Sequence, residues 1–307
     1  MCIAAGFTSL AQGVYDPQMK TELSTLFKYD DGPVLIDNAK IHIKKAAERL
    51  DYSVFEAVDA VKGYGVSFEN VDTTEKWAAL ANTLYLKIQA DSKAPADVFS
   101  GKTGADGIFK QDCIEPGLYL VYADPVVKGN WRYKAIPFLI ALPALNDDAS
   151  DYLKTVSAQF KVERERYYVP SNTRETVDVK VLKVWNDAGA EALRPESITV
   201  HLLKNGAVDR TIELSAQNDW RWTWNNLSDS YSWTVSEDTV EGYTTLITKE
   251  GITYRIENTA IVVPEQPRAQ VAGLSRLPQT GLMWWPAVVL LILGAGFIAF
   301  GIYRKKE

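Results

Sequence analysis

The stretch Thr176–Trp185, TVDVKVLKVW, decides the fold of the second half of the chain. Apolar and polar residues alternate along it, which is the pattern of a β-strand with one buried face. The residues on its apolar face are Val177, Val179, Val181, Lys183 and Trp185. A lysine therefore occupies a position that the pattern assigns to the core.

Two later strands show the same feature. Tyr231–Glu237 (YSWTVSE) and Ile252–Asn258 (ITYRIEN) also alternate, and their apolar faces end in Glu237 and Asn258. Burying an unpaired ammonium or carboxylate costs several kcal/mol. Three such residues on the apolar faces of one small β domain therefore require an explanation.

A reaction among these three side chains would explain the pattern. In a dry pocket the pKa of a lysine falls and that of a carboxylic acid rises, so both groups become neutral. The Lys183 amine could then attack the side-chain carbonyl of Asn258, while Glu237 hydrogen-bonds that oxygen and transfers protons as ammonia leaves. The product is an intramolecular isopeptide bond. In the alternative interpretation, Lys183 extends to solvent at a sheet edge and the other two residues cap strand ends.

The succession of motifs in this region resembles the Cna B-type domain, a stalk module of collagen adhesins. These motifs are VLKVWND, RPESITVHLLKNG, NDWRWTWNNL, YSWTVSEDTVEGY and YRIENT. The resemblance implies an inverse immunoglobulin-like β-sandwich over residues 177–261. It also implies that Lys183 is the bond-forming lysine, Glu237 the catalytic acid and Asn258 the bond-forming asparagine.

Three tryptophans, Trp220, Trp222 and Trp224, share one face of a further strand in this region. The resemblance places this strand inside the sandwich, so we expect the three rings in its core. An aromatic platform for carbohydrate is the alternative.

Residues 20–162 are expected to form a first β-sandwich with one helical excursion, joined to the second by a linker over 163–176. The phrases DDGPVLIDNAKIHIKKAAE, VDTTEKWAALANTLYLKI, SGKTGADGIFKQDCIEPGLYLVYAD and YKAIPFLIALP resemble the N-terminal domain of sortase-assembled pilins. Asp72 and Glu75 fit a capping box at the start of a helix over about 73–89. The residues expected on its buried side are Trp77, Leu80, Leu84 and Ile88.

Two family features are altered in the first domain. Related pilin domains often contain a second isopeptide bond, but here Ala123 stands in place of the acid and Asp124 follows it, so we predict no such bond. Shaft pilins carry a WxxxVxVYPK motif whose lysine accepts the threonine of the next subunit. Tyr152–Lys161 (YLKTVSAQFK) keeps the valine and the lysine but changes two distinctive residues. Lys161 is a candidate polymerising nucleophile, or simply a solvated lysine at a strand end.

An uncharged stretch near the C-terminus, Leu282–Tyr303, is long enough for a helix to cross the hydrocarbon core of a bilayer. Arg304, Lys305 and Lys306 follow it, as expected for a cytoplasmic flank. The sequence therefore predicts a C-terminal transmembrane helix with the rest of the chain outside the cell.

A pentapeptide, Leu277-Pro278-Gln279-Thr280-Gly281, comes directly before this span. The pentapeptide, span and basic tail over 277–307 resemble the cell-wall sorting signal of Gram-positive surface proteins. The resemblance implies that a sortase cuts between Thr280 and Gly281 and passes the Thr280 carbonyl to an amine. The amine would belong to a peptidoglycan precursor or to another pilin subunit. Residues 262–276 are expected to form a stalk before this signal.

The N-terminal segment over 1–19 begins with MCIAAGFTSLAQG, which is similar to the end of a signal peptide. Basic residues are absent before Lys20, which indicates a start codon assigned downstream of the true one or a trimmed sequence. A plain N-terminal arm is the alternative.

Composition excludes several classes of function. The chain of 307 residues has 33 basic and 39 acidic residues and a formal net charge of −6, so it has no electrostatic footprint for nucleic acid. Two separated cysteines, Cys2 and Cys113, argue against a disulfide framework or a thiolate metal site. His42 and His201 lie in alternating runs and are expected on the surface. We predict no metal and no cofactor.

Together these patterns predict an all-β protein with two tandem immunoglobulin-like β-sandwich domains. The expected function is that of a structural cell-surface protein, similar to a minor or basal pilin, attached covalently to the cell wall by sortase. Two alternatives stay open: an adhesin that binds host matrix or glycan, and a shaft pilin polymerised through Lys161. An enzyme is not expected, because the sequence has no Ser/His/Asp set, metal cluster or phosphate-binding loop.

Overall fold

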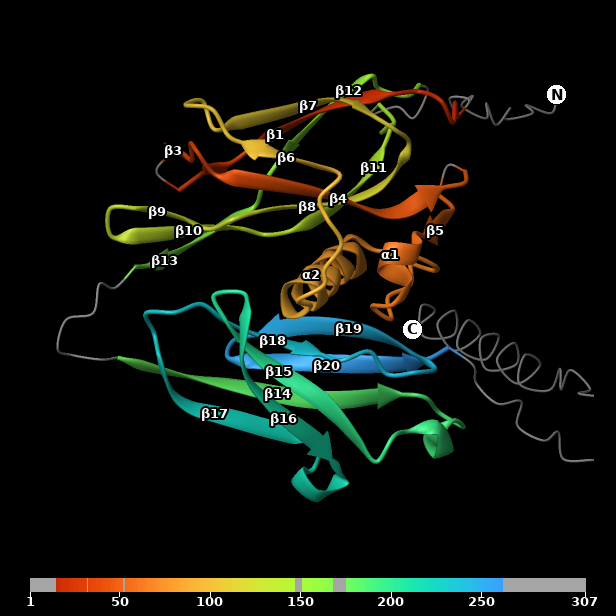
Figure 1. Cartoon of the computed structure of the whole chain (residues 1–307), viewed down its shortest axis with the longest axis vertical. Coiled ribbons are helices and arrows are strands. Elements are labelled where there is room, and N and C mark those ends of the chain that lie inside the picture. The colour runs from red at the N-terminus through yellow and green to blue at the C-terminus, as the bar shows by residue number, and fades with distance from the viewer. Residues whose placement is uncertain (1–14, 32, 52, 147–150, 168–174, 262–307) are drawn as a thin grey trace, which may run out of the picture. The chain divides into compact units, whose positions relative to one another are not determined.

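Strands dominate the protein, and they form two β domains that follow one another in the sequence (Figure 1). The structure is a computed structural model that describes residues 15–31, 33–51, 53–146, 151–167 and 175–261. The first domain uses strands between residues 21 and 166, and the second uses strands between 176 and 260. The prediction of a mainly β protein is confirmed for these residues.

The first domain is a sandwich with additional short strands. Its strands are β1 (Thr21–Leu26), β2 (Lys28–Tyr29), β3 (Val34–Leu35), β4 (Lys40–Arg49), β5 (Phe55–Ala57), β6 (Phe99–Lys102), β7 (Ile108–Ile114), β8 (Gly117–Ala123), β9 (Val126–Lys128), β10 (Trp131–Ala135), β11 (Phe138–Leu142), β12 (Thr155–Gln159) and β13 (Val162–Arg166). One sheet has the order β12-β1-β7 and the other β11-β8-β4-β5, with β6 also paired to β4. A third sheet has the order β13-β10-β9, and β2 pairs with β3.

Strand β8 is buried along its whole length because both of its faces are covered. Tyr119 and Val121 join the core between the two sheets. Leu118 and Leu120 point the other way, into a cluster with helix α2 (Thr74–Ala90). A strand covered on both faces has a continuous apolar sequence instead of an alternating one, as GLYLVYA does.

The helical excursion consists of α2 and the short α1 (Asp59–Lys62). The cap of α2 differs from the expected one, because the Thr73 hydroxyl accepts a hydrogen bond of 3.2 Å from the Lys76 backbone nitrogen. The Asp72 carboxylate instead pairs with the side chain of Lys76. Leu80, Leu84 and Ile88 are buried as predicted, whereas Trp77 is only partly buried.

The second domain is a sandwich of two sheets. Its strands are β14 (Thr176–Asn186), β15 (Ser197–Lys204), β16 (Ala207–Ser215), β17 (Arg221–Ser228), β18 (Trp233–Glu237), β19 (Tyr243–Glu250) and β20 (Thr253–Ala260), with short 3-10 turns η1 (Glu191–Leu193) and η2 (Ala216–Asn218). One sheet has the order β17-β14-β20-β19 and the other β16-β15-β18. The first and last strands, β14 and β20, are parallel neighbours.

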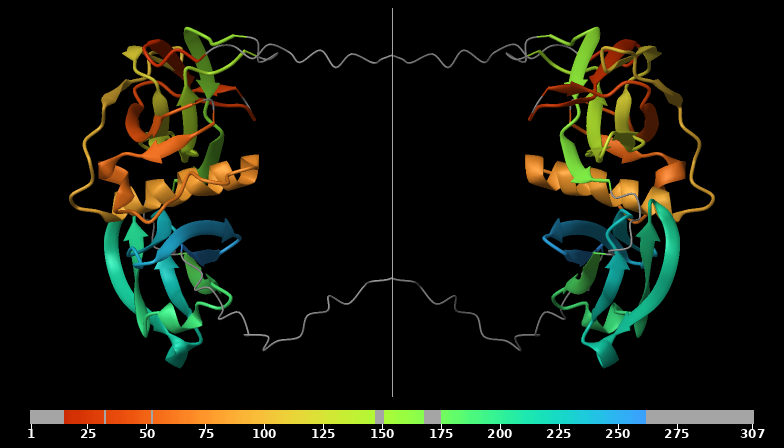
Figure 2. Two further views of the ribbon diagram at one scale, coloured as in Figure 1. Left: turned by 90° about the vertical axis from the view of Figure 1, so that its right-hand side faces the viewer. Right: turned by 90° about the vertical axis from the view of Figure 1, so that its left-hand side faces the viewer.

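Helix α2 lies between the strands of the two domains (Figures 1 and 2). It covers the free edge of β19, where the Thr83 hydroxyl accepts a hydrogen bond of 2.7 Å from the Ile247 backbone nitrogen. The Asn82 side chain donates one of 3.3 Å to the carbonyl of the same residue. Leu86 from this helix is part of the hydrophobic core of the second domain. Residues 15–261 therefore belong to one structural unit.

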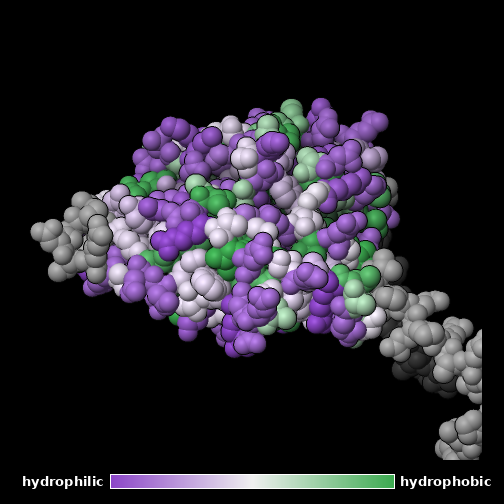
Figure 3. Space-filling view, turned by 60° about the horizontal axis from the view of Figure 1, so that its bottom comes forward, coloured by the Kyte–Doolittle hydropathy of each residue, from purple (hydrophilic) through white to green (hydrophobic). Residues whose placement is uncertain are grey.

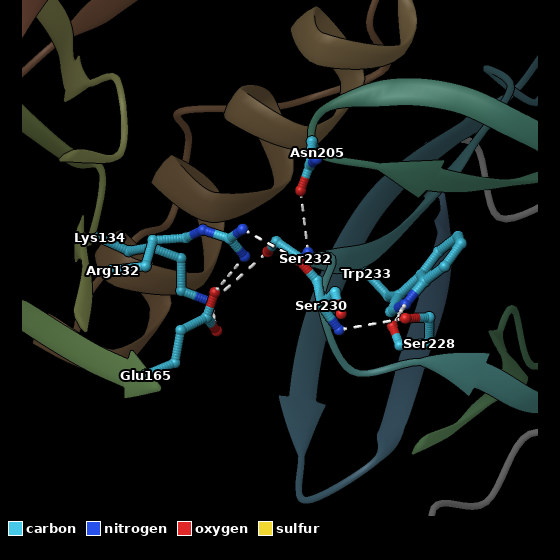
Figure 4. Close-up of polar contacts among 8 residues, drawn as sticks. All are labelled: Arg132, Lys134, Glu165, Asn205, Ser228, Ser230, Ser232 and Trp233. Carbon is cyan, nitrogen blue, oxygen red and sulfur yellow. Dashed lines mark hydrogen bonds and ion pairs between the residues drawn. The ribbon is translucent and has the colours of Figure 1, made fainter. Parts of the chain in front are cut away.

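A second set of polar contacts joins the domains on the side of β10 (Figure 4). Arg132 and Lys134 share the carboxylate of Glu165, at 2.9 and 2.6 Å. Arg132 also donates a hydrogen bond of 3.1 Å to the carbonyl of Ser230 in the second domain. Glu165 belongs to β13, so residues 163–166 form a strand and not the start of the expected linker. The ion pairs explain why the charged sequence VERER is ordered as a strand.

Trp222 and Trp224 lie in β17 and Trp220 directly precedes it, and the three side chains differ in burial. Trp224 is 4% exposed and belongs to the core as expected, but Trp222 is 44% exposed. Trp220 is partly buried and packs edge-on against Trp185 at 5.2 Å. The core prediction was wrong for Trp222, which lies on the edge strand β17.

Several segments that the sequence singles out lie outside the described residues. They are the signal-like segment 1–13, the linker residues 168–174, the stalk 262–276, the motif Leu277–Gly281 and the span Leu282–Tyr303. Across the residues that the structure does describe, no helix has the length and apolar character needed to cross a bilayer.

Replacing Thr73 by Ala should destabilise the first domain by about 1 kcal/mol, because the Lys76 amide loses its cap. The free energy of unfolding in urea measures this effect. Asp72→Ala is the matched control, and it should have the smaller effect because the Asp72 side chain makes only an exposed ion pair. The opposite order would show that Asp72 is the cap, as the sequence pattern predicts.

Candidate functional site

The parallel pairing of β14 with β20 brings Lys183 and Asn258 to neighbouring positions. Lys183 lies opposite Ile256, and Trp185, two residues further along, lies opposite Asn258. Residues two apart on a strand share a face, so Lys183 and Asn258 point into the same core. Glu237, the last residue of β18, comes from the facing sheet.

The carboxylate of Glu237 contacts both other side chains. Its Oε1 lies 3.3 Å from Lys183 Nζ and accepts a hydrogen bond of 3.3 Å from Asn258 Nδ2. Its Oε2 accepts a hydrogen bond of 3.2 Å from the hydroxyl of Thr245 on β19. The structure therefore brings together the three residues that the sequence pattern selects.

The site is closed to solvent. Lys183 is 4% exposed, Glu237 2% and Asn258 0%. This burial contradicts the alternative in which Lys183 extends to solvent. Lys183 Nζ is within ion-pair distance of Glu237 but not in hydrogen-bonding geometry, and Asn258 Oδ1 also has no hydrogen-bond partner. Buried polar atoms without partners are costly, which makes this cluster unusual for a purely structural core.

Burial lowers the pKa of Lys183 to about 8. Loss of water is the largest cause, because it disfavours the charged ammonium, and the Glu237 carboxylate opposes it. A second lysine, Lys87 of α2, lowers the pKa further. Lys183 therefore has a far larger neutral fraction near neutral pH than an ordinary lysine.

This arrangement supplies each component of an amide exchange. A neutral Lys183 amine is a nucleophile, and the side-chain amide of Asn258 is an electrophilic carbon with ammonia as its leaving group. The carboxyl of Glu237 touches both side chains, so it can hydrogen-bond and transfer protons between them. The new N–C bond would replace the Asn258 C–N bond, with release of one ammonia.

Sequence reasoning missed two groups around this site, Thr245 and Lys87. Thr245 donates a hydrogen bond to Glu237, and the ring of Trp185, which the pattern places on the face of Lys183, lies with its centroid 4.3 Å from Lys183 Nζ. Lys87, only 3% exposed, donates a hydrogen bond of 3.0 Å to the backbone carbonyl of Glu237. Thr245 could have been found, since it is a polar residue on the buried face of β19. Lys87 could not, because its partner belongs to the other domain.

The two histidines do not behave alike. His42 is 8% exposed, and its ring nitrogens lie 2.7 Å from Asp97 and 3.1 Å from Asp124. The expectation of a surface histidine was wrong for His42, because two carboxylates from distant parts of the sequence pair with it. His201 is partly exposed and contacts Asp238 at 2.8 Å.

The remaining candidate residues lie away from this cluster. Lys161 is exposed between β12 and β13, and its backbone carbonyl accepts a hydrogen bond of 2.8 Å from Ile136. Cys113 is a free, exposed thiol. Within the described ranges, no group of His, Cys, Asp and Glu side chains has an arrangement that could hold a metal ion.

Comparison with known proteins identifies the second domain. Residues 179–259 match the Cna protein B-type domain family. The chain is also 32% identical over 125 residues to a collagen adhesin from Staphylococcus aureus, a match that covers 35% of this chain and 11% of that protein. The chain thus spans about a tenth of the length of this relative. The resemblance seen in the sequence is confirmed for the domain that contains Lys183, Glu237 and Asn258.

Solved structures with detectable similarity include a single B repeat unit of the collagen-binding surface protein of Staphylococcus aureus. It is 14% identical, with a TM-score of 0.27, and the match covers 79% of this chain and 98% of that one. The major pilin of Corynebacterium diphtheriae is 10% identical, with a TM-score of 0.30, covering 78% and 98%. These TM-scores are low, so they add nothing to the assignment of the domain.

In the Asn258→Ala variant no bond can form. Its free energy of unfolding should increase as the pH rises from about 8 to the ordinary lysine pKa of 10.5. Over this range the unfolded chain keeps a proton on Lys183 that the folded chain has released, so stability rises with pH, by up to about 3 kcal/mol. Urea unfolding followed by tryptophan fluorescence measures it. The double variant Lys183→Met/Asn258→Ala should show a smaller rise, because it lacks the contribution of Lys183, and equal pH slopes in the two variants would contradict the lowered pKa of Lys183.

Proposed function

We propose that this protein is a structural component of the surface of a Gram-positive bacterium, similar to a minor or basal pilin, with a self-formed cross-link between Lys183 and Asn258. The observation that carries the proposal is the closed cluster of lysine, acid and asparagine inside a Cna B-type domain. The protein would act as a load-bearing element and not as an enzyme with turnover.

The position of the cross-link suits a mechanical role. The first and last strands of the domain are parallel, so force applied to the two ends of the domain pulls β14 and β20 in opposite directions. Without a covalent link, hydrogen bonds to neighbouring strands and core packing are what resist that shear. An isopeptide bond would carry the load and, like a disulfide, would also restrict the unfolded chain. Unlike a disulfide it does not depend on the redox conditions outside the cell.

Attachment to the cell wall is the second part of the proposal. It rests on the sequence Leu277–Gly281, the uncharged span and the basic tail, which together are similar to a sorting signal. A sortase would be the enzyme, Thr280 the point of attachment, and a peptidoglycan precursor or another pilin subunit the acceptor.

An adhesin that uses the Cna B-type domain as a stalk is the second candidate, because the curated relative is named as a collagen adhesin. In that case the host ligand would bind the first domain. Figure 3 brings the second domain forward, and on that face apolar side chains are scattered among polar ones and form no large patch. The face shown therefore gives no support for an apolar docking surface on the second domain.

Intact mass spectrometry of residues 15–261 should find a chain that is one ammonia lighter than its sequence requires. Lys183→Ala and Asn258→Ala should each restore the full mass, because each removes one end of the bond. Glu237→Ala should block or strongly slow the reaction.

Lys180→Ala is the matched control, because Lys180 is an exposed lysine on the same strand. It should keep the mass deficit. A full, unmodified mass in the unsubstituted protein would refute the cross-link.

Cell fractionation tests the anchoring. In a Gram-positive cell that exports the full chain and contains a sortase, the protein should be released by a muramidase and not by detergent. Thr280→Ala should leave it in the membrane fraction, whereas Gln279→Ala, at the variable position of the motif, should not. Wall attachment that survives Thr280→Ala would contradict the proposal, and ladders abolished by Lys161→Ala would replace it with the shaft-pilin alternative.

A further inference from the structure

A buried lysine of the first domain contacts the backbone of Glu237. Lys87 lies in the last turn of α2, is 3% exposed, and donates a hydrogen bond of 3.0 Å to the Glu237 carbonyl. A buried lysine must recover the cost of leaving water through specific contacts. This hydrogen bond goes to the residue whose side chain contacts both other members of the cluster.

The first domain also contacts the residue that supports the Glu237 side chain. Thr245 donates its hydroxyl proton to Glu237 Oε2, and its backbone nitrogen donates a hydrogen bond of 2.8 Å to the carbonyl of Gly65. Nearby, the Thr239 hydroxyl donates one of 2.8 Å to the carbonyl of Gly63. Contacts from the first domain therefore fix both the main chain of Glu237 and the partner of its side chain.

The charge of Lys87 acts on the site as well. Glu237, Lys87 and Glu257 are the charged groups that influence Lys183, and Lys87 is the one whose positive charge disfavours the Lys183 ammonium. Burial is the largest influence on Lys87 and lowers its pKa, whereas the carboxylates of Glu237 and Asp238 oppose that effect and favour its charged form. A second positive charge beside a lysine that must be neutral to react favours the reactive form.

We infer that Lys87 is a positioning residue for the cross-linking reaction, and that docking of the first domain through α2 prepares the second domain to form its bond. The inference rests on the proposed cross-link and extends it, because it makes the reaction depend on a residue outside the Cna B-type domain. Lys87 is hydrogen-bonded to the backbone of Glu237 and takes no part in bond exchange. It acts through Glu237 and through its charge.

This dependence would order the assembly of the protein. A second domain that folds before the first has docked would hold Glu237 less firmly and Lys183 in a more protonated state. The cross-link would then form mainly in chains whose two domains are correctly joined. The presence of the cross-link would then indicate that the two domains had packed correctly against each other.

The rate of bond formation tests the inference. The chain over 15–261 is synthesised in a short cell-free pulse, and samples are quenched at intervals and weighed by intact mass spectrometry at a series of pH values. Lys87→Met should form the bond more slowly at neutral pH, because removal of the Lys87 charge raises the pKa of Lys183 and so lowers its neutral fraction. The midpoint of its rate–pH profile should move to higher pH.

Three further variants separate positioning from general loosening. Lys87→Gln should show the same shift of midpoint, which keeps the test valid if the Met variant folds poorly. Asn82→Ala loosens α2 on β19 without altering charge, so it should slow the reaction with an unchanged midpoint. Lys76→Met, an exposed lysine on the same helix, should behave as the unsubstituted chain does.

The outcomes distinguish this inference from the proposed function. If the unsubstituted chain forms the bond and both Lys87 variants match its rate and midpoint, the inference is wrong and the cross-link stands. Slower reaction of the Lys87 variants with an unshifted midpoint would overturn the role of the charge. If the unsubstituted chain keeps its full mass at all times, the cross-link itself is refuted, and the inference fails with it.

Discussion

The parallel pairing of β14 with β20 is the constraint on which the rest of the second domain depends. Parallel neighbours cannot be joined by a tight turn and need a long connection. Here all the other strands of the domain, β15 to β19, lie between β14 and β20 in the sequence. The pairing sets the register that places Asn258 two residues beyond the partner of Lys183. It also places the ends of the domain at opposite ends of one ladder. The same geometry thus creates the weak point under load and brings together the residues that could reinforce it.

Burial determines what those residues can do. At 4% exposure, Lys183 has lost most of its hydration, and a carboxylate at 3.3 Å does not hydrogen-bond it in good geometry. In an ordinary core this cluster would be destabilising, because Lys183 Nζ and Asn258 Oδ1 are both buried without a hydrogen bond. Conversion of the amine and the amide into one new amide would remove the amine's charge and release the leaving nitrogen as ammonia. The buried polar cluster is then the reactant state of the cross-linking reaction.

The sequence was sufficient for the cluster but not for its surroundings. Lys183, Glu237 and Asn258 are visible because each interrupts an alternating apolar face, and such an interruption depends only on local periodicity. Lys87 is hidden because α2 is buried from two sides, and no helical period distinguishes a lysine that faces a second domain from one that faces water. His42 was misjudged for a related reason, since Asp97 and Asp124 reach it from distant segments. Burial between separate layers is a tertiary property that no strand or helix pattern carries.

The most direct test of the Lys183–Asn258 cross-link is a peptide map of the protein over residues 15–261. After proteolysis, fragmentation mass spectrometry should find one branched peptide in which the Lys183 side chain from β14 is joined to the Asn258 side chain from β20, one ammonia lighter than its two components. Separate linear peptides, one with an unmodified Lys183 and one with an unmodified Asn258, would show that the isopeptide bond does not form.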